Sequence, residues 1–437
     1  MGSRGRSDLD AGLAAAVEKM RRDGASEAAR DAFRRMYEQL LAGDRGELAG
    51  DELEPVRDVR GLDALPGDAA ADLVDRVAIL KLNGGLGTSM GLSAPKSLIE
   101  VKPGRTFLDV IVRQVLASRR RYGARLPLVL MDSFSTERAT RDALARYPEL
   151  AADVPAQFVQ SRVPRLRADD LHPVRWPANP QLEWSPPGHG DLYASLIGSG
   201  MLDALLEHGY EHLFVSNVDN LGAVLEPRVL AFADRARLPF LMEVVEGTEA
   251  DRKGGHVARR DGRLVLRESG QVPAGDDSFT DFRRWRYYNT NNLWLHLPWL
   301  ADHGLPRLPL IVNRKSVVAA DASTPQVLQL ETAMGAALGA IDGGEIVLVP
   351  RTRFAPVKTT NDLLVVRSDA YVLDPDDARL EPAPQRGGAP PPFVDLDRRF
   401  YTTLADFEAR FPAGPPSLVA AERLVVRGDV TFGEAPA

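Results

Sequence analysis

The stretch "ILKLNGGLGTSMGLSAPKSLIEV" (79–101) contains the features that decide the fold. A short apolar run, which we expect to be a strand over 77–82, leads into a loop with glycines at 84, 85, 87 and 91. In open α/β sheets, ligands bind beyond the carboxyl ends of strands. Glycines let backbone N–H groups approach a phosphate closely, and Lys96 adds a mobile positive charge. The stretch therefore predicts a phosphate-binding loop rather than a plain tight turn.

The composition is that of a large globular protein. The chain has 437 residues, 44% of them hydrophobic, and a formal net charge of −7, so we expect two or three domains. The acidic balance argues against a nucleic-acid partner. Without cysteine, neither disulfides nor thiolate metal sites can form. No apolar run reaches the ~18 residues of a membrane span, and the polar N-terminus is no signal peptide, so we expect a cytoplasmic protein without a membrane partner.

Strand and helix patterns alternate along most of the chain. This predicts an α/β fold with a mixed, mainly parallel sheet and helices on both faces. Residues 10–48 have helical spacing of apolar side chains, and two runs around Asp261-Gly262 predict a β-hairpin over 256–269. Further strands are expected at 126–133, 156–161, 212–220, 239–246, 287–297 and 345–350, and further helices at 106–122, 136–146, 192–208 and 326–340.

The same patterns divide the chain into four parts. We expect a helical N-terminal extension (1–60), a central α/β domain (61–375), a Pro/Gly-rich linker (376–392) and a small C-terminal domain (393–437).

Several other segments carry residues that suit phosphate and sugar chemistry. Asp219 ends the strand "HLFVSNVDN", where a carboxylate beside a phosphate loop is a natural Mg²⁺ ligand. In "PPGHGD", His189 can donate to a phosphate or sugar oxygen, and Asp191 can cap the helix that follows. The cluster "YNTNN" (288–292) offers amides of the kind that recognise sugar hydroxyls. Lys358 precedes a capped helix, in a chain where only seven of 54 basic residues are lysine.

One competing motif is an S-x-x-K pattern at 93–96, which is typical of penicillin-binding enzymes. That chemistry needs the serine and the lysine one turn apart on a helix, and Pro95 disfavours a helix there. The residues themselves therefore point to a nucleotide-sugar enzyme.

Taken together, the motifs resemble those of the eukaryotic-type UTP–glucose-1-phosphate uridylyltransferases, also called UDP-glucose pyrophosphorylases. The resemblance rests on "KLNGGLGTSMG…PKSL", "QSRVPR", "PPGHGDLYAS", "FVSNVDNLGA", "NTNNLW", "QLETAMGAA" and "RFAPVKTTNDLL", which follow the family order across about 70–430. It implies a Rossmann-like nucleotidyltransferase domain. It also implies a Mg²⁺-dependent reaction in which UTP and glucose 1-phosphate give UDP-glucose and pyrophosphate.

The resemblance also implies roles for individual residues. Lys96 and Lys358 would act as the catalytic cations that face the triphosphate, and Asp219 would bind the metal. The nucleotide would be held by Leu82, Asn83, Gly84 and Gly85, with Gln160 and Gly188 reading uracil. The sugar phosphate and glucose would contact His189, Asn217, Lys253, Glu268, Asn289 and Asn291.

Two alternatives stay open beside this function. One is a UDP-sugar pyrophosphorylase with a different or broader sugar-1-phosphate specificity, and the other is a catalytically silent nucleotide-sugar sensor. In the family, a C-terminal left-handed β-helix begins at a stretch like "RLVVRGDVTFG" (423–433), of which this sequence contains only a short remnant. We therefore expect 424–432 to pack against neighbouring structure as an isolated strand, or to be loosely held. We also expect a monomer or a dimer rather than an end-to-end β-helix oligomer.

Overall fold

The computed structural model describes residues 6–44, 46–67 and 71–433. Its contacts divide the chain into two compact units. The first unit comprises 1–67, 158–213 and 229–348, and the second comprises 68–157, 214–228 and 349–437. No boundary between these units falls at the expected junctions after 375 and 392, so the four-part division stays a prediction.

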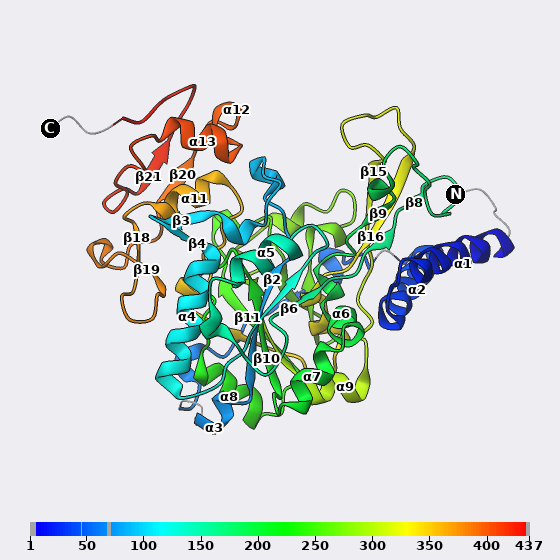
Figure 1. Cartoon of the computed structure of the whole chain (residues 1–437), viewed down its shortest axis with the longest axis horizontal. Helices are drawn as coiled ribbons and strands as arrows, with labels where there is room; N and C mark the ends of the chain where they lie inside the picture. The colour runs from blue at the N-terminus through cyan, green and yellow to red at the C-terminus, as the bar shows by residue number, and fades with distance from the viewer. Residues whose placement is uncertain (1–5, 45, 68–70, 434–437) are drawn as a thin grey trace. The chain divides into compact units, whose positions relative to one another are not determined.

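The first unit is built on strands that pair in both directions (Figure 1). Its helices are α1 (Arg6–Arg22), α2 (Glu27–Ala42), α6 (Leu192–Gly198), α7 (Met201–Glu207), most of α8 (Pro227–Arg235), α9 (Leu297–His303) and α10 (Ala337–Ala340). Its strands are β1 (Glu54–Pro55), β7 (Val163–Pro164), β8 (Leu166–Arg167), β9 (Trp184–Ser185), β11 (Phe240–Glu246), β12 (His256–Arg260), β13 (Arg263–Arg267), β14 (Tyr287–His296), β15 (Ile311–Ser316), β16 (Gln326–Glu331) and β17 (Glu345–Leu348). Strand β11 pairs antiparallel with β14 and parallel with β17.

The predicted hairpin is confirmed, because β12 and β13 pair antiparallel in register from His256↔Arg267 to Arg260↔Arg263. Asp261 and Gly262 both have positive φ, 52° and 78°. A two-residue hairpin turn of this twist needs that backbone, which Asp tolerates and Gly adopts freely.

The helix expected at 326–340 is wrong over its first half. Residues 326–331 form strand β16, which pairs with β15 and β8, and only Ala337–Ala340 is α-helical. In "QVLQLE", Val327, Gln329 and Leu330 are buried and Gln326 is exposed. The pairing with two neighbouring strands therefore overrides the helix propensity of the segment.

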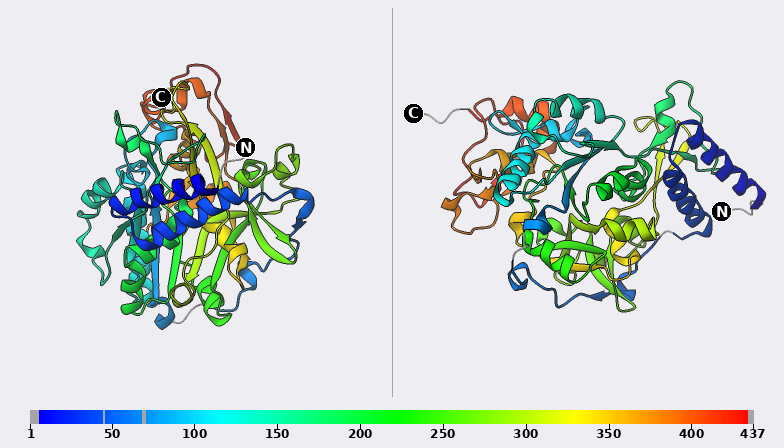
Figure 2. Two further views of the ribbon diagram at one scale, coloured as in Figure 1. Left: turned by 90° about the vertical axis from the view of Figure 1, so that its right-hand side faces the viewer. Right: turned by 60° about the horizontal axis from the view of Figure 1, so that its bottom comes forward.

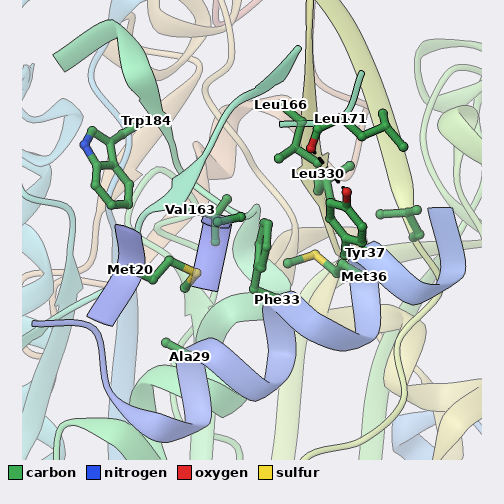
Figure 3. Packing of buried hydrophobic residues seen from close by; sticks show 12 residues of the cluster. Met20, Ala29, Phe33, Met36, Tyr37, Val163, Leu166, Leu171, Trp184 and Leu330 are labelled. Carbon is green, nitrogen blue, oxygen red and sulfur yellow. Dashed lines mark hydrogen bonds between the residues drawn. The ribbon is translucent and has the colours of Figure 1, made fainter. Parts of the chain in front are cut away.

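The N-terminal region is helical, but as two helices rather than one. Gly24 has φ 83°, and the Ser26 hydroxyl accepts from the Ala29 N–H to cap α2. The two helices lie side by side (Figure 2). Phe33 and Tyr37 of α2 are fully buried, and the Tyr37 hydroxyl donates to the Leu171 carbonyl at 3.2 Å (Figure 3). Burial of this apolar face of α2 fixes the two helices within the first unit.

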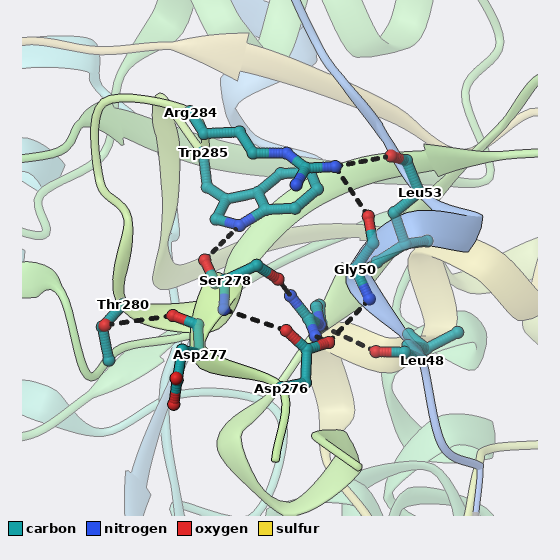
Figure 4. A network of polar contacts seen from close by, with 10 residues as sticks. Leu48, Gly50, Leu53, Asp276, Asp277, Ser278, Thr280, Arg284 and Trp285 are labelled. Carbon is teal, nitrogen blue, oxygen red and sulfur yellow. Dashed lines mark hydrogen bonds and ion pairs between the residues drawn. The ribbon is translucent and has the colours of Figure 1, made fainter. Parts of the chain in front are cut away.

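A polar network fixes the segment after α2 (Figure 4). The fully buried Arg267 donates to the Leu48 carbonyl and pairs with Asp276, and Asp276 also accepts from the Gly50 N–H. Arg284 donates to the Gly50 carbonyl at 2.7 Å. These bonds satisfy a buried guanidinium that would otherwise be costly to desolvate.

The second unit contains helices α3 (Ala71–Val74), α4 (Phe107–Tyr122), α5 (Glu137–Leu144), α11 (Thr360–Arg367), α12 (Arg398–Tyr401) and α13 (Leu404–Arg410). Its strands are β2 (Val77–Asn83), β3 (Glu100–Lys102), β4 (Arg105–Thr106), β5 (Leu128–Asp132), β18 (Tyr371–Leu373), β19 (Leu380–Pro382), β20 (Phe393–Asp395) and β21 (Arg423–Val425). Two strands, β6 (Gln157–Val159) and β10 (His212–Asn217), contain residues of both units. Strands β2 and β5 pair parallel, and their buried apolar runs are typical of such strands.

Two expected elements are shorter than their patterns suggest. The helix expected at 192–208 breaks at Gly200, whose φ is 76°, and becomes α6 and α7. The strand expected at 212–220 ends at Asn217, because the Asn220 N–H donates to the Asn217 carbonyl and turns the chain. Asp219 therefore lies in this turn.

The C-terminal segment is paired. Strand β21 pairs parallel with β20, with Val394 opposite Leu424, and the Phe432 ring stacks on Phe411 at 4.8 Å. The expected packing of this segment against neighbouring structure is confirmed, but its strand is not isolated, because β20 supplies a partner. The expected linker is also packed, since it contains β19, and Arg386 donates to the carbonyls of Leu418 and Val419.

Candidate functional site

The glycine loop doubles back on itself in the second unit. The Gly87 N–H donates to the Ala94 carbonyl at 3.3 Å, and the Lys96 N–H donates to the Gly85 carbonyl at 3.2 Å. Lys96 thus returns to the point where β2 ends. Ser93 lies in this non-helical return, so the geometry that the S-x-x-K motif requires is absent from this described segment.

Asn83 anchors the start of the loop through its side chain. Its amide donates to Asp132 Oδ1 at 2.6 Å and to Thr140 Oγ1 at 2.8 Å, and the residue is fully buried. Burial raises the pKa of the Asp132 carboxyl, against the opposing effect of its hydrogen-bond donors. The Asn83 amide nitrogen is therefore committed to the interior, and the Leu82 and Gly85 carbonyls accept from the Val218 and Lys96 N–H groups.

Lys96 and Asp219 are brought together by this loop. The Lys96 ammonium lies 2.5 Å from Asp219 Oδ2, and the two side chains are only 15% and 14% exposed. The other oxygen, Asp219 Oδ1, is buried and has no hydrogen-bond partner among the described residues. A buried carboxylate oxygen without a donor is a candidate ligand for a cation.

Lys358 is tied to the same turn through the backbone. The Val357 N–H donates to the Asp219 carbonyl at 3.1 Å, and Asn220 Oδ1 accepts from the Ala355 N–H at 2.9 Å. Lys358 itself is exposed and directly precedes α11, which Thr359 and Asp362 cap reciprocally as expected. The structure therefore groups Lys96, Asp219 and Lys358 around one turn, with Asn217 at its start. We call these residues, together with 82–85, the glycine-loop set.

Lys81 is a structural partner of this set that the sequence argument missed. It is fully buried on β2, where its ammonium donates to Ser216 Oγ at 2.7 Å and to the Ala223 carbonyl at 2.8 Å. These two acceptors flank the turn that carries Asn217 and Asp219. The sequence signal for this role was a lysine inside an otherwise apolar predicted strand.

In the first unit, the "PPGHGD" loop packs closely on 332–334. A Cβ added to Gly188, whose φ is 77°, would lie 2.4 Å from the Thr332 carbonyl oxygen, and one added to Gly190 would lie 2.2 Å from Thr332 Oγ1. The Gly190 N–H donates to the Thr332 carbonyl at 2.9 Å. Both glycines are therefore required by a close approach, and Thr332 is a second residue that the sequence argument missed.

His189 has a defined tautomer. Its Nδ1 accepts from the Met334 N–H at 3.0 Å, so the proton of the neutral ring lies on Nε2. Burial lowers the pKa of His189 to about 4. At neutral pH this side chain is therefore an uncharged N–H donor.

Asp191 does not cap α6 as expected. Its side chain makes no capping bond, and Oδ2 accepts instead from the Ser161 N–H at 2.6 Å and from the Ser195 hydroxyl at 2.5 Å. Burial raises the pKa of this carboxyl to about 6, against the effect of its donors. The carboxylate instead binds a second segment of chain, whose Ser161 N–H donates both to Asp191 Oδ2 and to Ser195 Oγ.

The asparagines of "YNTNN" lie at an irregularity of β14. The pairing with β11 shifts between Met242 and Val244, and Asn291 has φ 59°, which asparagine tolerates better than most residues. The Asn289 amide donates to Asn291 Oδ1, and Asn289 Oδ1 accepts from the Asn291 N–H, both at 2.8 Å. The bulge thus holds two half-buried amides side by side.

Glu268 lies against Gly255, whose backbone pairs with that of Asn289. A Cβ added to Gly255 would come within 2.7 Å of the Glu268 carboxylate, and the Gly255 carbonyl accepts from the Asn289 N–H at 3.0 Å. We call Gln160, Gly188, His189, Lys253, Glu268, Asn289 and Asn291 the amide set. Lys253 is exposed on a turn, and no described contact of its ammonium joins it to the others.

A cavity of about 1140 Å³ lies elsewhere in the first unit, lined by Lys19, Arg167 and Trp176 among others. It contains no residue of the amide set. No helix among the described residues is long and apolar enough to cross a membrane.

Comparisons with known proteins identify relatives along nearly the whole chain. A sequence model of the family described as UTP–glucose-1-phosphate uridylyltransferase matches residues 30–436. The chain is 41% identical over 373 residues to a probable UTP–glucose-1-phosphate uridylyltransferase of Schizosaccharomyces pombe, covering 84% of this chain and 72% of that protein. It is 39% identical over 421 residues to the UTP–glucose-1-phosphate uridylyltransferase of Musa acuminata, covering 94% and 88%. The solved UDP-glucose pyrophosphorylase of Leishmania major matches with a TM-score of 0.92 at 43% identity, covering 97% of this chain and 92% of that one.

Proposed function

This chain belongs to the UTP–glucose-1-phosphate uridylyltransferase family, and on that premise we propose that it transfers the uridylyl group of UTP to glucose 1-phosphate. The products are UDP-glucose and pyrophosphate. The observation that carries the proposal is the Lys96–Asp219 pair at the end of the glycine loop, with Lys358 tied to the same turn. Two lysines and one carboxylate with a free oxygen suit a polyphosphate substrate.

The reaction is a single in-line displacement. A phosphate oxygen of glucose 1-phosphate attacks the α-phosphorus of UTP, and the bond from that phosphorus to the β-bridging oxygen breaks. Pyrophosphate leaves with the bonding electrons. The attacking oxygen is already anionic, so no general base is required. The obstacle is repulsion between two anions, which Lys96 and Lys358 reduce by placing positive charge beside the transferring group.

Asp219 fits a Mg²⁺ ligand. Its Oδ1 is buried and, within the described chain, has no hydrogen-bond partner, while Oδ2 is held by Lys96. Mg²⁺ is usually bound by one or two carboxylates and by substrate phosphates. When bound there, the ion would supply positive charge to the phosphates. The ion pair with Lys96 orients the Asp219 carboxylate.

The amide set is assigned to the uracil and glucose groups. Gln160 and the backbone at Gly188 would read the uracil edge, since an amide both donates and accepts. His189 would donate from Nε2 to the sugar phosphate, with Asn217 as a second contact. Glu268, Asn289 and Asn291 would hold glucose hydroxyls, and Lys253 would supply charge from its exposed turn.

A second candidate is the same transfer to a different or broader range of sugar 1-phosphates. The pair of half-buried amides at the β14 bulge suits hydroxyl groups in general, so it does not by itself select glucose. The cytoplasmic location and the monomeric or dimeric state stay predictions.

The experiment is product identification by ³¹P NMR after incubation with UTP, glucose 1-phosphate and Mg²⁺. We expect UDP-glucose and pyrophosphate in equal amounts. With one diastereomer of the UTP analogue that has sulfur in place of a non-bridging α-phosphate oxygen, a single displacement inverts the configuration at the α-phosphorus. Retention would contradict the direct attack, and the absence of UDP-glucose would contradict the proposed function.

A further inference from the structure

Asp191 links two segments of the amide set that are distant in sequence. Its carboxylate oxygen Oδ2 accepts from the Ser161 N–H at 2.6 Å, and its own N–H donates to the Gly188 carbonyl at 3.2 Å. Ser161 directly follows Gln160, and Gly188 begins the turn that carries His189. One buried residue therefore contacts both segments to which uracil recognition is assigned, the first through its carboxylate and the second through its backbone N–H.

The chain segment between this contact and Gln160 is short. Strand β6 ends at Val159, so Gln160 is the only residue between the end of the strand and the Ser161 amide that Asp191 holds. With its backbone fixed on both sides, Gln160 has little freedom except in its own side chain. The Asp191 carboxylate thus limits where the Gln160 amide can lie.

Burying the Asp191 carboxylate costs desolvation free energy, and hydrogen bonds to the start of α6 do not offset this cost. Asp191 is only 5% exposed, and burial of a carboxylate is unfavourable unless strong donors compensate. The compensation comes from Ser161 and from Ser195, one turn along α6, rather than from the N–H groups at the start of that helix. The carboxylate is therefore placed to join segments, and its raised pKa is consistent with this burial.

We infer that Asp191 is a positioning residue for uracil recognition, which fixes Gln160 relative to the Gly188-His189 turn. This inference rests on the proposed function. It assigns to Asp191 no contact with substrate. Charge-assisted hydrogen bonds to a backbone N–H are well suited to the task, since they are short and directional.

The test compares kcat/KM for UTP with kcat/KM for CTP, which differs from UTP at the base edge that Gln160 would read. The variants are Asp191→Ala, Gln160→Ala and the double variant. We expect each single variant to lower the preference for UTP by about 10- to 100-fold, the range expected when a buried polar group, here the uracil edge, is left without its hydrogen-bond partner. We expect the double variant to lose little more than either single one, because both changes remove the same recognition.

Two further variants keep the test decisive. Ser195→Ala removes one donor to Asp191 and the longer of the two bonds of the Ser161 N–H, at 3.1 Å, but leaves the 2.6 Å bond from that N–H to Asp191. The UTP preference should therefore stay within about threefold of wild type. If Asp191→Ala does not fold, Asp191→Asn replaces it, because the amide keeps one acceptor oxygen but loses the charge, and a smaller loss of preference is expected. Circular dichroism and melting temperature establish folding in each case.

Three results would overturn the inference. They are an unchanged UTP preference in the folded Asp191 variants, a loss that adds in full to that of Gln160→Ala, or no loss in Gln160→Ala itself. Failure of the proposed function is a separate outcome, because the wild-type chain would then form no UDP-glucose from UTP.

Discussion

Lys96 and Asp219 form an ion pair in which one carboxylate oxygen is neutralised and the other has no hydrogen-bond partner among the described residues. The lysine comes from the return of the glycine loop, and the aspartate from the turn after β10. The backbone of that turn also holds Val357, next to Lys358. The arrangement places two cations and one free carboxylate oxygen around one turn, which is the pattern expected of a site for a metal-bound polyphosphate.

Asp219→Asn should raise the Mg²⁺ concentration needed for half-maximal activity and lower the maximal rate. The reason is that an amide oxygen is a weaker ligand for a hard cation than a carboxylate. The measurement is a Mg²⁺ titration of initial rates at saturating substrates. Lys96→Met is the matched control, because it breaks the same ion pair but keeps the carboxylate. A Mg²⁺ requirement like that of wild type in Asp219→Asn would show that another residue holds the metal.

Lys358→Ala should reduce kcat by about 10²–10³-fold while UTP affinity changes by less than about tenfold, since it removes one preorganised charge from the transferring group. Single-turnover rates and equilibrium binding of UTP separate the two effects. Lys315→Ala, an exposed lysine on β15, is the control and should leave both values unchanged. Near-normal turnover in purified Lys358→Ala would exclude the assigned role.

Two substitutions at Asn291 separate the contribution of its side-chain amide from that of its backbone conformation. At φ 59°, Asn291→Gly keeps the bulge conformation and removes the amide, whereas Asn291→Ala also adds backbone strain of about 1 kcal/mol. If the amide holds a glucose hydroxyl, both variants should raise KM for glucose 1-phosphate by about tenfold and leave KM for UTP unchanged. A normal KM in Asn291→Gly together with a raised one in Asn291→Ala would mean that only the bulge geometry matters.

His256 should make the protein sensitive to acid. The ring is fully buried, stacks on Trp285 at 4.9 Å and, in the described structure, has no hydrogen-bond partner on either nitrogen. Burial, together with the charges of Arg267 and Arg284, lowers its pKa from 6.5 to about 3. The unfolded chain therefore binds this proton below pH 6.5 and the folded chain does not, so stability falls as pH drops from 6.5 toward 3.

The size of this effect is roughly 1.5 kcal/mol between pH 6.5 and pH 5 for a shift of this extent. Urea unfolding of wild type and His256→Phe at both pH values measures it, because phenylalanine keeps the ring contacts but cannot bind a proton. The variant should lose that much less stability on acidification. His208→Gln, which removes an exposed histidine, should behave like wild type. Equal acid sensitivity in His256→Phe and wild type would contradict the account.

Much of the α/β fold could be predicted from the sequence because its signals are local. The apolar run of β2, the Asp261-Gly262 turn and the capping residues of α11 each determine their own segment. The segment 326–331 could not be assigned in this way. Its apolar residues fit both a helix and a strand, and the outcome depends on β15 and β8, which are distant in sequence.

The candidate site shows the same division. Lys96 and Asp219 could be expected near each other, because both follow the ends of strands in one sheet. The contacts of Asp191 and Lys81 could not, since each depends on an acceptor or a donor from a segment more than 25 residues away. Asp191 matched a helix cap in the sequence, and only the position of Ser161 shows where its carboxylate is used.

The central claim is that this chain joins UTP to glucose 1-phosphate, and pyrophosphate release across a panel of substrates tests it most directly. The wild-type protein would be assayed with UTP against glucose, galactose and N-acetylglucosamine 1-phosphates, and with glucose 1-phosphate against UTP, CTP, ATP and GTP. Lys358→Ala is the background control for a contaminating activity. We predict that kcat/KM is highest for UTP with glucose 1-phosphate and falls sharply in the variant. A higher value for another pair, or no pyrophosphate release from UTP and glucose 1-phosphate, would contradict the account.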